Sequence, residues 1–185
     1  MKHLTISLLL ASSIPFAAHA VEYNQVQADK SATSFAYKQM GVAMDGKFRK
    51  FATQLSFDPA KPASAKANID VDLASIDTGS SEADQEVAGK QWFNTKAFPT
   101  AHFTSSSVKP LGGNRYEVVG QLTIKGRTQT MTAPTTVTIQ GNNAIFDGAF
   151  VIKRADFAIG EGPWADFGTV ANEIAIKFHI LAAGK

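Results

Sequence analysis

The sequence predicts an all-β fold, an antiparallel up-and-down β-barrel of about eight strands with one short helix near the barrel mouth. Apolar and polar residues alternate in one short run after another, the period-two pattern of strands with one buried and one wet face. Pro, Gly and Asn separate most of these runs as turn signals. Strands joined by such hairpins favour an antiparallel barrel over a parallel sheet.

Residues 1–20 are predicted to be a cleaved secretory signal peptide. Lys2 and His3 precede the apolar run 4–11, and the segment ends in the small-residue pattern Ala-His-Ala at 18–20. The apolar part is too short to span a bilayer, although a retained membrane anchor is the alternative. We therefore expect a secreted, periplasmic protein whose single domain occupies residues 21–185.

The composition limits the classes of partner and of stabilising bond. The chain of 185 residues has no Cys, which excludes disulfides and a lipid attached at a lipoprotein cysteine. Its formal net charge is +2, and such a near-neutral balance argues against a nucleic-acid partner. The chain is long enough to bury a core without disulfides or a metal.

The first half of the chain predicts three strand-like runs and a helix. The run 32–37 comes first, and the run 47–58 follows with a shift of parity that suggests a bulge or a corner. The run 65–73 is the clearest amphipathic strand, because its apolar residues alternate with Asn and Asp. The sequence Ser-Glu-Ala-Asp at 81–84 is a helix-start pattern and predicts a short helix over about residues 81–90.

Two-residue and three-residue turns divide the second half into regular hairpins. Strands are predicted over residues 101–111, 115–124 and 127–139, separated by Gly-Gly-Asn and Lys-Gly turns. The last stretch, 144–181, holds two alternating runs that flank a Gly-rich loop carrying Trp164.

No catalytic or metal-binding pattern is present in the sequence. His102 and His179 lie at the parity opposite their apolar neighbours, which predicts outward-facing side chains. A Ser-His-Asp triad assembled in space stays open as an alternative, although the chain has no G-x-S-x-G elbow. Asp70, Asp72 and Asp77 fit the solvated face of a strand and its turn better than a metal site. We expect no metal and no cofactor other than a bound lipid.

The aromatic residues leave a choice between two kinds of interior. The chain has 13 Phe, three Tyr and two Trp, largely on the apolar parity of the predicted strands. A barrel of about eight strands has an interior that side chains can fill or that can hold one small ligand. The sequence pattern fits both the filled and the hollow interior.

Several segments, in this order and spacing, resemble the YceI-like polyisoprenoid-binding family, secreted bacterial proteins with a lipocalin-like barrel. The resembling segments are 29–32, 46–48, 68–78, 92–94, 98–105, 120–126 and 154–160. The resemblance implies an apolar interior that binds a long isoprenoid or similar lipid, and it implies binding rather than catalysis.

The chain departs from the family pattern on the short helix. Many members carry an Arg-Asp-x-His run there, whereas this chain has Ala-Asp-Gln-Glu at 83–86. A carboxylate in place of the His would repel a pyrophosphate, which favours a neutral lipid such as a prenyl quinone or a fatty amide over a phosphorylated one. A monomer or homodimer with transient contact to the membrane or to envelope proteins completes the expectation.

The resemblance and the strand parity together give a set of candidate lipid-binding residues. The residues expected around the apolar tail are Phe35, Tyr37, Phe57, Ile69, Val71, Trp92, Phe103, Leu122, Phe150, Trp164 and Phe178. The residues expected at the headgroup are Lys90, Lys125 and Arg154. Two other functions stay open: a small secreted hydrolase that uses His102 or His179, and a solid-core barrel that acts as a protein interaction module.

Overall fold

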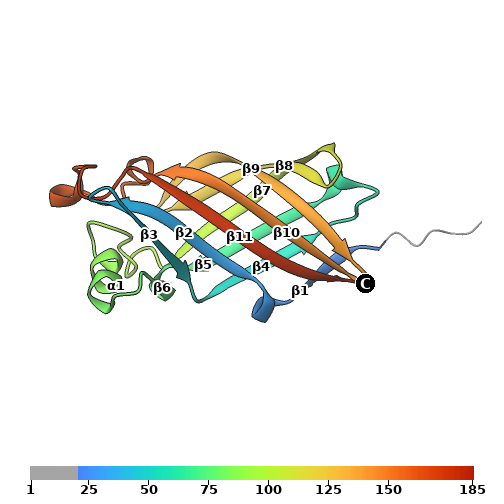
Figure 1. Ribbon diagram of the computed structural model, residues 1–185, viewed down its shortest axis with the longest axis horizontal. Coiled ribbons are helices and arrows are strands. Elements are labelled where there is room, and N and C mark those ends of the chain that lie inside the picture. Colours follow the sequence, from blue (N-terminus) through green and yellow to red (C-terminus); the bar gives the residue numbers. More distant parts are fainter. Residues whose placement is uncertain (1–20) are drawn as a thin grey trace, which may run out of the picture.

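One antiparallel sheet of eleven strands curls around a long axis in the computed structural model, which describes residues 21–185 (Figure 1). The strands are β1 (Tyr23–Val26), β2 (Ala32–Gln39), β3 (Val42–Phe48), β4 (Phe51–Ser56), β5 (Lys66–Asp72), β6 (Ile76–Asp77), β7 (Thr100–Gly112), β8 (Arg115–Ile124), β9 (Arg127–Gln140), β10 (Asn143–Lys153) and β11 (Glu173–Gly184). The α-helix is α1 (Ser81–Ala88), and five short 3-10 helices lie at Ala28–Lys30, Pro62–Ser64, Leu73–Ser75, Arg154–Phe157 and Gly162–Trp164. The predicted signal peptide, residues 1–20, lies outside the described residues.

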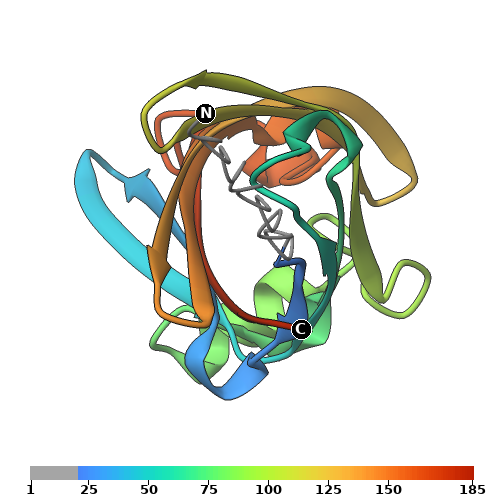
Figure 2. The ribbon, with the colours of Figure 1, turned by 90° about the vertical axis from the view of Figure 1, so that its right-hand side faces the viewer.

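Hydrogen bonds link the strands in the order β4-β5-β7-β8-β9-β10-β11-β2-β3-β6, and β1 pairs with the far end of β11. Tyr23 of β1 exchanges two backbone hydrogen bonds of 2.9 and 3.1 Å with Phe57, so that β1 connects β11 to the end of β4. Viewed along the axis, the strands surround the centre of the molecule (Figure 2). The predicted all-β antiparallel barrel is confirmed, with eleven strands in place of about eight.

The two ends of the barrel are built differently. Helix α1 lies at one end together with the β2–β3 hairpin and the loop between β10 and β11 (Figure 1). The C-terminus and the β1 strand lie at the opposite end. We call the end that carries α1 the helix end. The polar and cationic groups described below lie there.

A corner at Arg49 and Lys50 explains the shift of parity in the run 47–58. Two strands meet there, and they continue into different neighbours: β3 pairs with β2, whereas β4 pairs with β5. The run is therefore two strands and not one. The corner is held by a backbone hydrogen bond of 3.0 Å from the Arg49 N–H to the Ser75 carbonyl.

The sequence did not indicate β1 or most of β3. The inward positions of β3 include Gly46, which contributes no side chain and hides the alternation. Strand β1 has four residues, of which Tyr23 alone is deeply buried. It forms because its backbone fills the gap between β11 and Phe57, which is a tertiary requirement that four residues do not reveal.

The predicted β8–β9 turn and helix α1 are both present, and single residues determine the turn conformation and the start of the helix. Lys125 and Gly126 have φ angles of 50° and 74°, the two left-handed positions of a type I′ hairpin turn between β8 and β9. Helix α1 starts at Ser81, as predicted, and the residue before it, Ser80, is the N-cap, because its hydroxyl accepts from the Ala83 N–H. It ends at Ala88, two residues before the predicted end.

Three phenylalanine rings lie over glycines of a neighbouring strand inside the barrel. A Cβ atom built on any of these glycines would collide with the ring above it. Such a ring can lie flat along the wall, because the glycine leaves the space that a side chain would fill. The pairs are Phe35 over Gly46, Phe103 over Gly120 and Phe178 over Gly148.

We predict that Gly148→Ala lowers the free energy of unfolding by about 1–3 kcal/mol, the usual cost of overpacking an interior. The new methyl group would meet the Phe178 ring and the Pro134 carbonyl oxygen. Urea unfolding followed by circular dichroism measures the change. Ala149→Ser, at the exposed neighbouring position, is the matched control and should stay within about 0.5 kcal/mol of the wild type. Equal unfolding midpoints for Gly148→Ala and wild type would contradict the ring-over-glycine packing.

Candidate functional site

Two adjoining cavities occupy the interior of the barrel. The larger, of about 480 Å³, lies at the helix end, and the smaller, of about 130 Å³, lies deeper in the barrel. Apolar side chains make up most of the lining of both cavities. The residues that line both are Thr33, Val71, Ala101, Leu122, Phe150 and Ile176. The cavities therefore share a wall near the middle of the barrel, and the volume of the larger one falls in the range of small-molecule sites.

The structure brings all eleven of the expected tail residues to these cavities. Phe35, Tyr37, Trp92 and Trp164 line the helix-end cavity, while Phe57, Ile69, Phe103 and Phe178 line the inner cavity, and Val71, Leu122 and Phe150 line both. Strand parity accounts for the residues within strands, whereas Trp92 and Trp164 come from the turn after α1 and from the β10–β11 loop.

Other lining residues were missed by the sequence analysis. Those with the same strand parity as the predicted residues could have been found, among them Ile152, Ile174 and Ile176. Those that reach the cavity from α1 and the turn after it, Val87 and Phe93, had no strand pattern to indicate them. Their place is decided by how α1 packs on the end of the barrel.

Three buried polar atoms have no hydrogen-bond partner within residues 21–185. They are Thr33 Oγ1, Thr53 Oγ1 and Trp92 Nε1, and each of the three residues lines a cavity. Buried polar groups in proteins are nearly always paired with protein or water. These three atoms are therefore unpaired polar groups enclosed within the protein, with almost no exposed surface of their own.

Polar side chains gather where the helix-end cavity meets α1. Gln39, Thr78, Glu82 and Glu86 belong to its lining. Trp164 Nε1 donates a hydrogen bond of 2.8 Å to Glu86 Oε1, which joins the β10–β11 loop to the helix. We call this group, with Trp164, the mouth of the barrel.

Acidic groups surround the Tyr37 hydroxyl near the mouth. Burial raises the pKa of Tyr37, and the negative charges of Asp45 and Asp84 raise it further. Asp84 is the acid that the sequence analysis placed in the helix pattern. Its Oδ1 atom accepts hydrogen bonds of 2.8 Å from both the N–H and the hydroxyl of Thr78, so that it fixes the turn before α1.

Arg154 is the cation of the helix-end cavity, and it is 1% exposed. Burial lowers the pKa of its guanidinium, and the Asp166 carboxylate acts in the opposite direction. Its N–H groups donate to backbone carbonyls of the β10–β11 loop, those of Ile159, Gly160, Trp164, Asp166, Val170 and Ala171, at 2.7–3.3 Å. The guanidinium therefore holds the loop in place from within.

The two predicted lysines lie apart from the cavity lining. Lys125 Nζ donates to the Ala158 carbonyl at 2.6 Å and to Glu161 Oε2 at 2.9 Å. These bonds hold the pKa of the Glu161 carboxyl below its ordinary value. Lys90 is exposed in the turn after α1.

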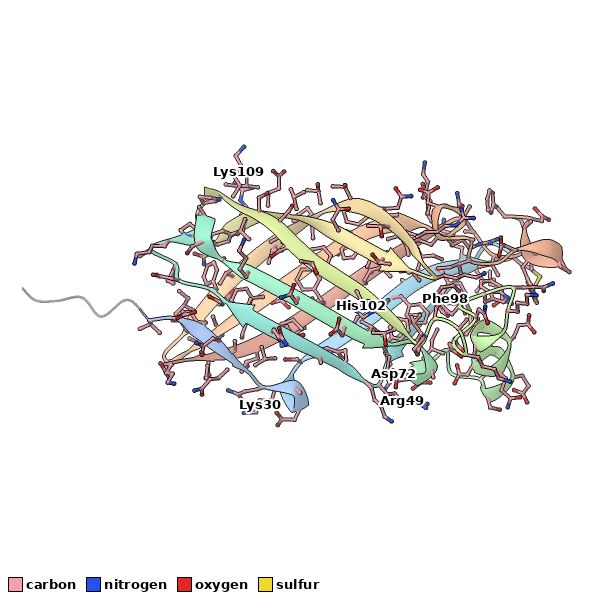
Figure 3. The ribbon with its side chains drawn as sticks, turned by 180° about the vertical axis from the view of Figure 1, so that it is seen from behind. Lys30, Arg49, Asp72, Phe98, His102 and Lys109 are labelled. Carbon is pink, nitrogen blue, oxygen red and sulfur yellow. The ribbon has the colours of Figure 1, made fainter. Side chains whose placement is uncertain are left out.

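His102 and His179 lie on the outer face of the barrel, as their parity predicts (Figure 3 for His102). The Nδ1 atom of His102 is 2.7 Å from Asp70 Oδ1, and that of His179 is 2.6 Å from Asp147 Oδ1. Each pair joins directly opposed residues on neighbouring strands. Neither His belongs to the lining of the two cavities.

Two kinds of feature are absent from the part of the chain that the structure describes. Residues 21–185 contain no group of three or more His, Asp or Glu side chains placed to hold a metal ion. Over the same residues, no helix has both the length and the apolar character needed to cross a membrane.

Comparison with known families matches a YceI-like domain to residues 24–182. The chain belongs to the YceI-like family. A UPF0312 protein of Yersinia pestis (strain Pestoides F) is 33% identical to it over 153 residues, which are 79% of this chain and 77% of that protein. BcnA of Burkholderia cenocepacia is similar in structure, with a TM-score of 0.84 and 46% identity over 86% of this chain and 100% of that chain.

More distant YceI-like structures share the fold. A polyisoprenoid-binding domain from Saccharophagus degradans, implicated in plant cell wall breakdown, has a TM-score of 0.69 at 15% identity and covers 90% of this chain and 99% of that chain. A YceI protein of Campylobacter jejuni has a TM-score of 0.68 at 21% identity, and the match covers 76% of this chain and 84% of that chain. Both confirm the barrel.

In this YceI-like barrel, we predict that Arg154→Met lowers the free energy of unfolding by about 3 kcal/mol or more. The substitution would leave several buried carbonyl oxygens without donors, and hydrogen bonds from a charged group are the stronger kind. Chemical denaturation gives the stability, and hydrogen exchange of the amides in 158–172 reports on the loop.

Lys153→Met is the matched control for Arg154→Met, because Lys153 is the exposed neighbour and loses the same positive charge. It should leave both measurements near those of the wild type. A stable Arg154→Met variant with unchanged exchange in the loop would show that the guanidinium does not organise it.

Proposed function

We propose that this protein holds a long isoprenoid or similar lipid chain inside its barrel and carries or sequesters it, without catalysing a reaction. The observation that supports the proposal is the pair of adjoining apolar cavities in the barrel interior. An apolar chain removes water from these walls and gains the free energy of burial. The relative from Saccharophagus degradans, described as a polyisoprenoid-binding domain, supports the same class of ligand.

Chain length supplies the affinity in such a site. Each buried CH₂ group contributes about 0.8 kcal/mol, so ten buried carbons give about 8 kcal/mol before the costs of ordering. The flat rings over Gly46, Gly120 and Gly148 keep the interior wide enough for a chain to enter. An apolar wall of this kind discriminates poorly between chains that differ by one methylene.

The observations favour this proposal over the two other functions that the sequence left open. A solid-core interaction module requires an interior filled by side chains, which the two cavities oppose. A hydrolase that uses His102 or His179 would need its substrate on the outer wall, where His179 and Asp147 line a surface pocket, because neither histidine lines the two interior cavities. Lipid binding explains the cavities and needs neither histidine.

We further propose that the protein works in the periplasm, as a monomer or homodimer, and takes up its lipid through transient contact with a membrane or an envelope protein. Met40 and Phe167 support such contact, because they are 72% and 46% exposed. Met40 follows Gln39 of the cavity lining and its N–H donates to the Thr169 carbonyl, so both apolar side chains lie beside the mouth.

We predict that Ala101→Trp weakens lipid binding at least tenfold, because Ala101 lines both cavities and an indole there would occupy the space between them. Native mass spectrometry of protein from the periplasmic fraction should show wild type with a bound lipid mass and Ala101→Trp without it. Titration with a fluorescent polyene fatty chain gives the change in dissociation constant.

Ala149→Trp adds the same indole to the exposed face of β10 and is the matched control. Circular dichroism and thermal melting show whether each variant is folded. Because Ala101→Trp could disturb packing, the smaller change Ala133→Leu, in the inner cavity alone, is a second variant. Wild-type protein that carries no lipid and binds no polyene would contradict the proposed function.

A separate prediction concerns the first twenty residues. The mature protein in the periplasmic fraction should begin at Val21, which intact-mass measurement and N-terminal sequencing can check. Changing Ala18 and Ala20 to bulky residues should leave an uncleaved precursor. An intact mass that includes residues 1–20 in the soluble periplasmic fraction would refute the cleavage site.

A further inference from the structure

A pocket on the outer wall of the barrel holds charged groups that the proposed lipid site does not use. This outer pocket has a volume of about 620 Å³ and lies over β9, β10, β11 and β2, beside the hairpin between β7 and β8. Its charged lining residues are Arg115, Asp147, Lys177 and His179. None of these four lines the helix-end cavity or the inner cavity.

Strand register explains how the outer pocket forms. The residues of one outward-facing row, each the cross-strand partner of the next, are Arg115 of β8, Thr136 of β9, Asp147 of β10 and His179 of β11. From Arg115 to His179 the row covers three strand spacings, about 14 Å. Small residues beside the row leave the space between its long side chains open. They are Ala32, Ser34 and Ala149.

Two cations of the outer pocket have no acidic partner. Arg115 and Lys177 are exposed, and neither forms an ion pair within residues 21–185. Asp147 supplies the one carboxylate among the lining residues of the described chain, and its Oδ1 atom lies 2.6 Å from Nδ1 of His179. The two cations therefore outnumber the carboxylate, and a pocket with this balance attracts an anion.

The contact with Asp147 orients the imidazole of His179. Because Nδ1 faces the carboxylate, Nε2 is left for a ligand, to which it donates when the ring is protonated and from which it accepts when the ring is neutral. His102 forms the same kind of pair with Asp70, at 2.7 Å, but does not line the outer pocket. The His102 pair is therefore a control within the same molecule.

The uncharged part of the lining includes apolar surface. Leu111, which is 46% exposed, and Pro134 belong to it. Arginine and lysine N–H groups bind the oxygens of carboxylates and phosphates, whereas apolar surface gains free energy when an apolar group covers it. A ligand that combines both properties satisfies the whole pocket.

We propose that the outer pocket is a second binding site, for a small organic anion in which a carboxylate or a phosphate is joined to an apolar group. Arg115 and Lys177 bind the anionic oxygens, and His179 contacts the ligand through Nε2. The apolar group covers Leu111 and Pro134. This site goes beyond the proposed lipid binding, because it lies outside the barrel and can be occupied whether or not the interior holds a lipid.

The first experiment tests the charge. 4-Fluorobenzoate and 4-fluorophenyl phosphate are titrated into lipid-free wild type and followed by fluorine NMR, with 4-fluorobenzyl alcohol as the uncharged probe. Each anion should bind about tenfold more tightly than the alcohol, and salt should reduce the difference. Backbone amide shifts should be largest in residues 134–136, 147–149 and 177–179. Equal affinities for the anions and the alcohol would overturn the proposal.

The double variant Arg115→Gln/Lys177→Gln should weaken binding of both anions about tenfold, because it removes both unpaired cations. Lys38→Gln/Lys153→Gln removes the same two charges at exposed positions outside the outer pocket and is the matched control. It should leave both affinities near those of the wild type. Equal losses in the two double variants would show an effect of overall charge and would overturn the assignment.

The two histidines test the contact through Nε2. His179→Gln should weaken the anions about threefold, as expected for the loss of one ligand contact. His102→Gln breaks the equivalent pair on another part of the outer wall and should have no effect. Equal affinities in the two variants would remove His179 from the site.

Two tryptophan substitutions separate the outer pocket from the barrel interior. Ala149→Trp places an indole in the outer pocket, and it should abolish binding of the anions while the fluorescent polyene still binds. Ala101→Trp should do the reverse, because Ala101 lines both interior cavities. Loss of the anions in a folded Ala101→Trp variant, with retention in Ala149→Trp, would place them in the interior. That result would overturn the second site and leave lipid binding intact.

Two further probes identify the source of the anionic oxygens. Inorganic phosphate should bind about tenfold more weakly than 4-fluorophenyl phosphate, because it covers none of the apolar surface. Vesicles of phosphatidylcholine and phosphatidylglycerol should sediment wild type and Arg115→Gln/Lys177→Gln to the same extent. Sedimentation that depends on these two cations, without binding of the free anions, would assign the pocket to a lipid headgroup and overturn the small ligand.

Discussion

The packing of phenylalanine rings over glycines is the constraint on which the rest of the molecule depends. A β-barrel of this size has an interior that side chains can fill, and 13 Phe residues would be enough to help fill it. Because Gly46, Gly120 and Gly148 have no side chain, three rings can lie along the wall and leave the axis open. The two cavities, and with them the proposed lipid site, follow from that arrangement.

The helix end depends in turn on one buried cation. The loop between β10 and β11 has little regular structure, and its carbonyls turn inward to the guanidinium of Arg154. Trp164, held by this loop, reaches across to Glu86 of α1. The sequence suggested Arg154 for a ligand headgroup, but its N–H groups donate to carbonyl oxygens of the protein backbone. Its role in the structure is to fix the shape of the mouth.

Interior and mouth differ in the groups that they offer to a ligand in the proposed function. The apolar walls supply affinity in proportion to chain length and little selectivity. The mouth holds the polar part of the lining, with the carboxylates of Glu82 and Glu86. Asp84, the one residue of the run 83–86 that keeps the family pattern, acts indirectly, because it fixes Thr78 and the turn before α1. Glu82 and Glu86 are the acids that the fold brings to the cavity.

The sequence by itself determined the strands that alternate cleanly, the Lys125-Gly126 turn and the inward face of each strand, because these depend on neighbours in the chain. For the same reason, the expected tail residues that lie in strands line a cavity, whereas Trp92 and Trp164 reach it from a turn and a loop. The tertiary structure alone decided the corner at Arg49, the presence of β1, and which carbonyl oxygens accept hydrogen bonds from Arg154 and Lys125. It also decided that the barrel is hollow, since strand parity says which way a side chain points but not what lies opposite it across the axis.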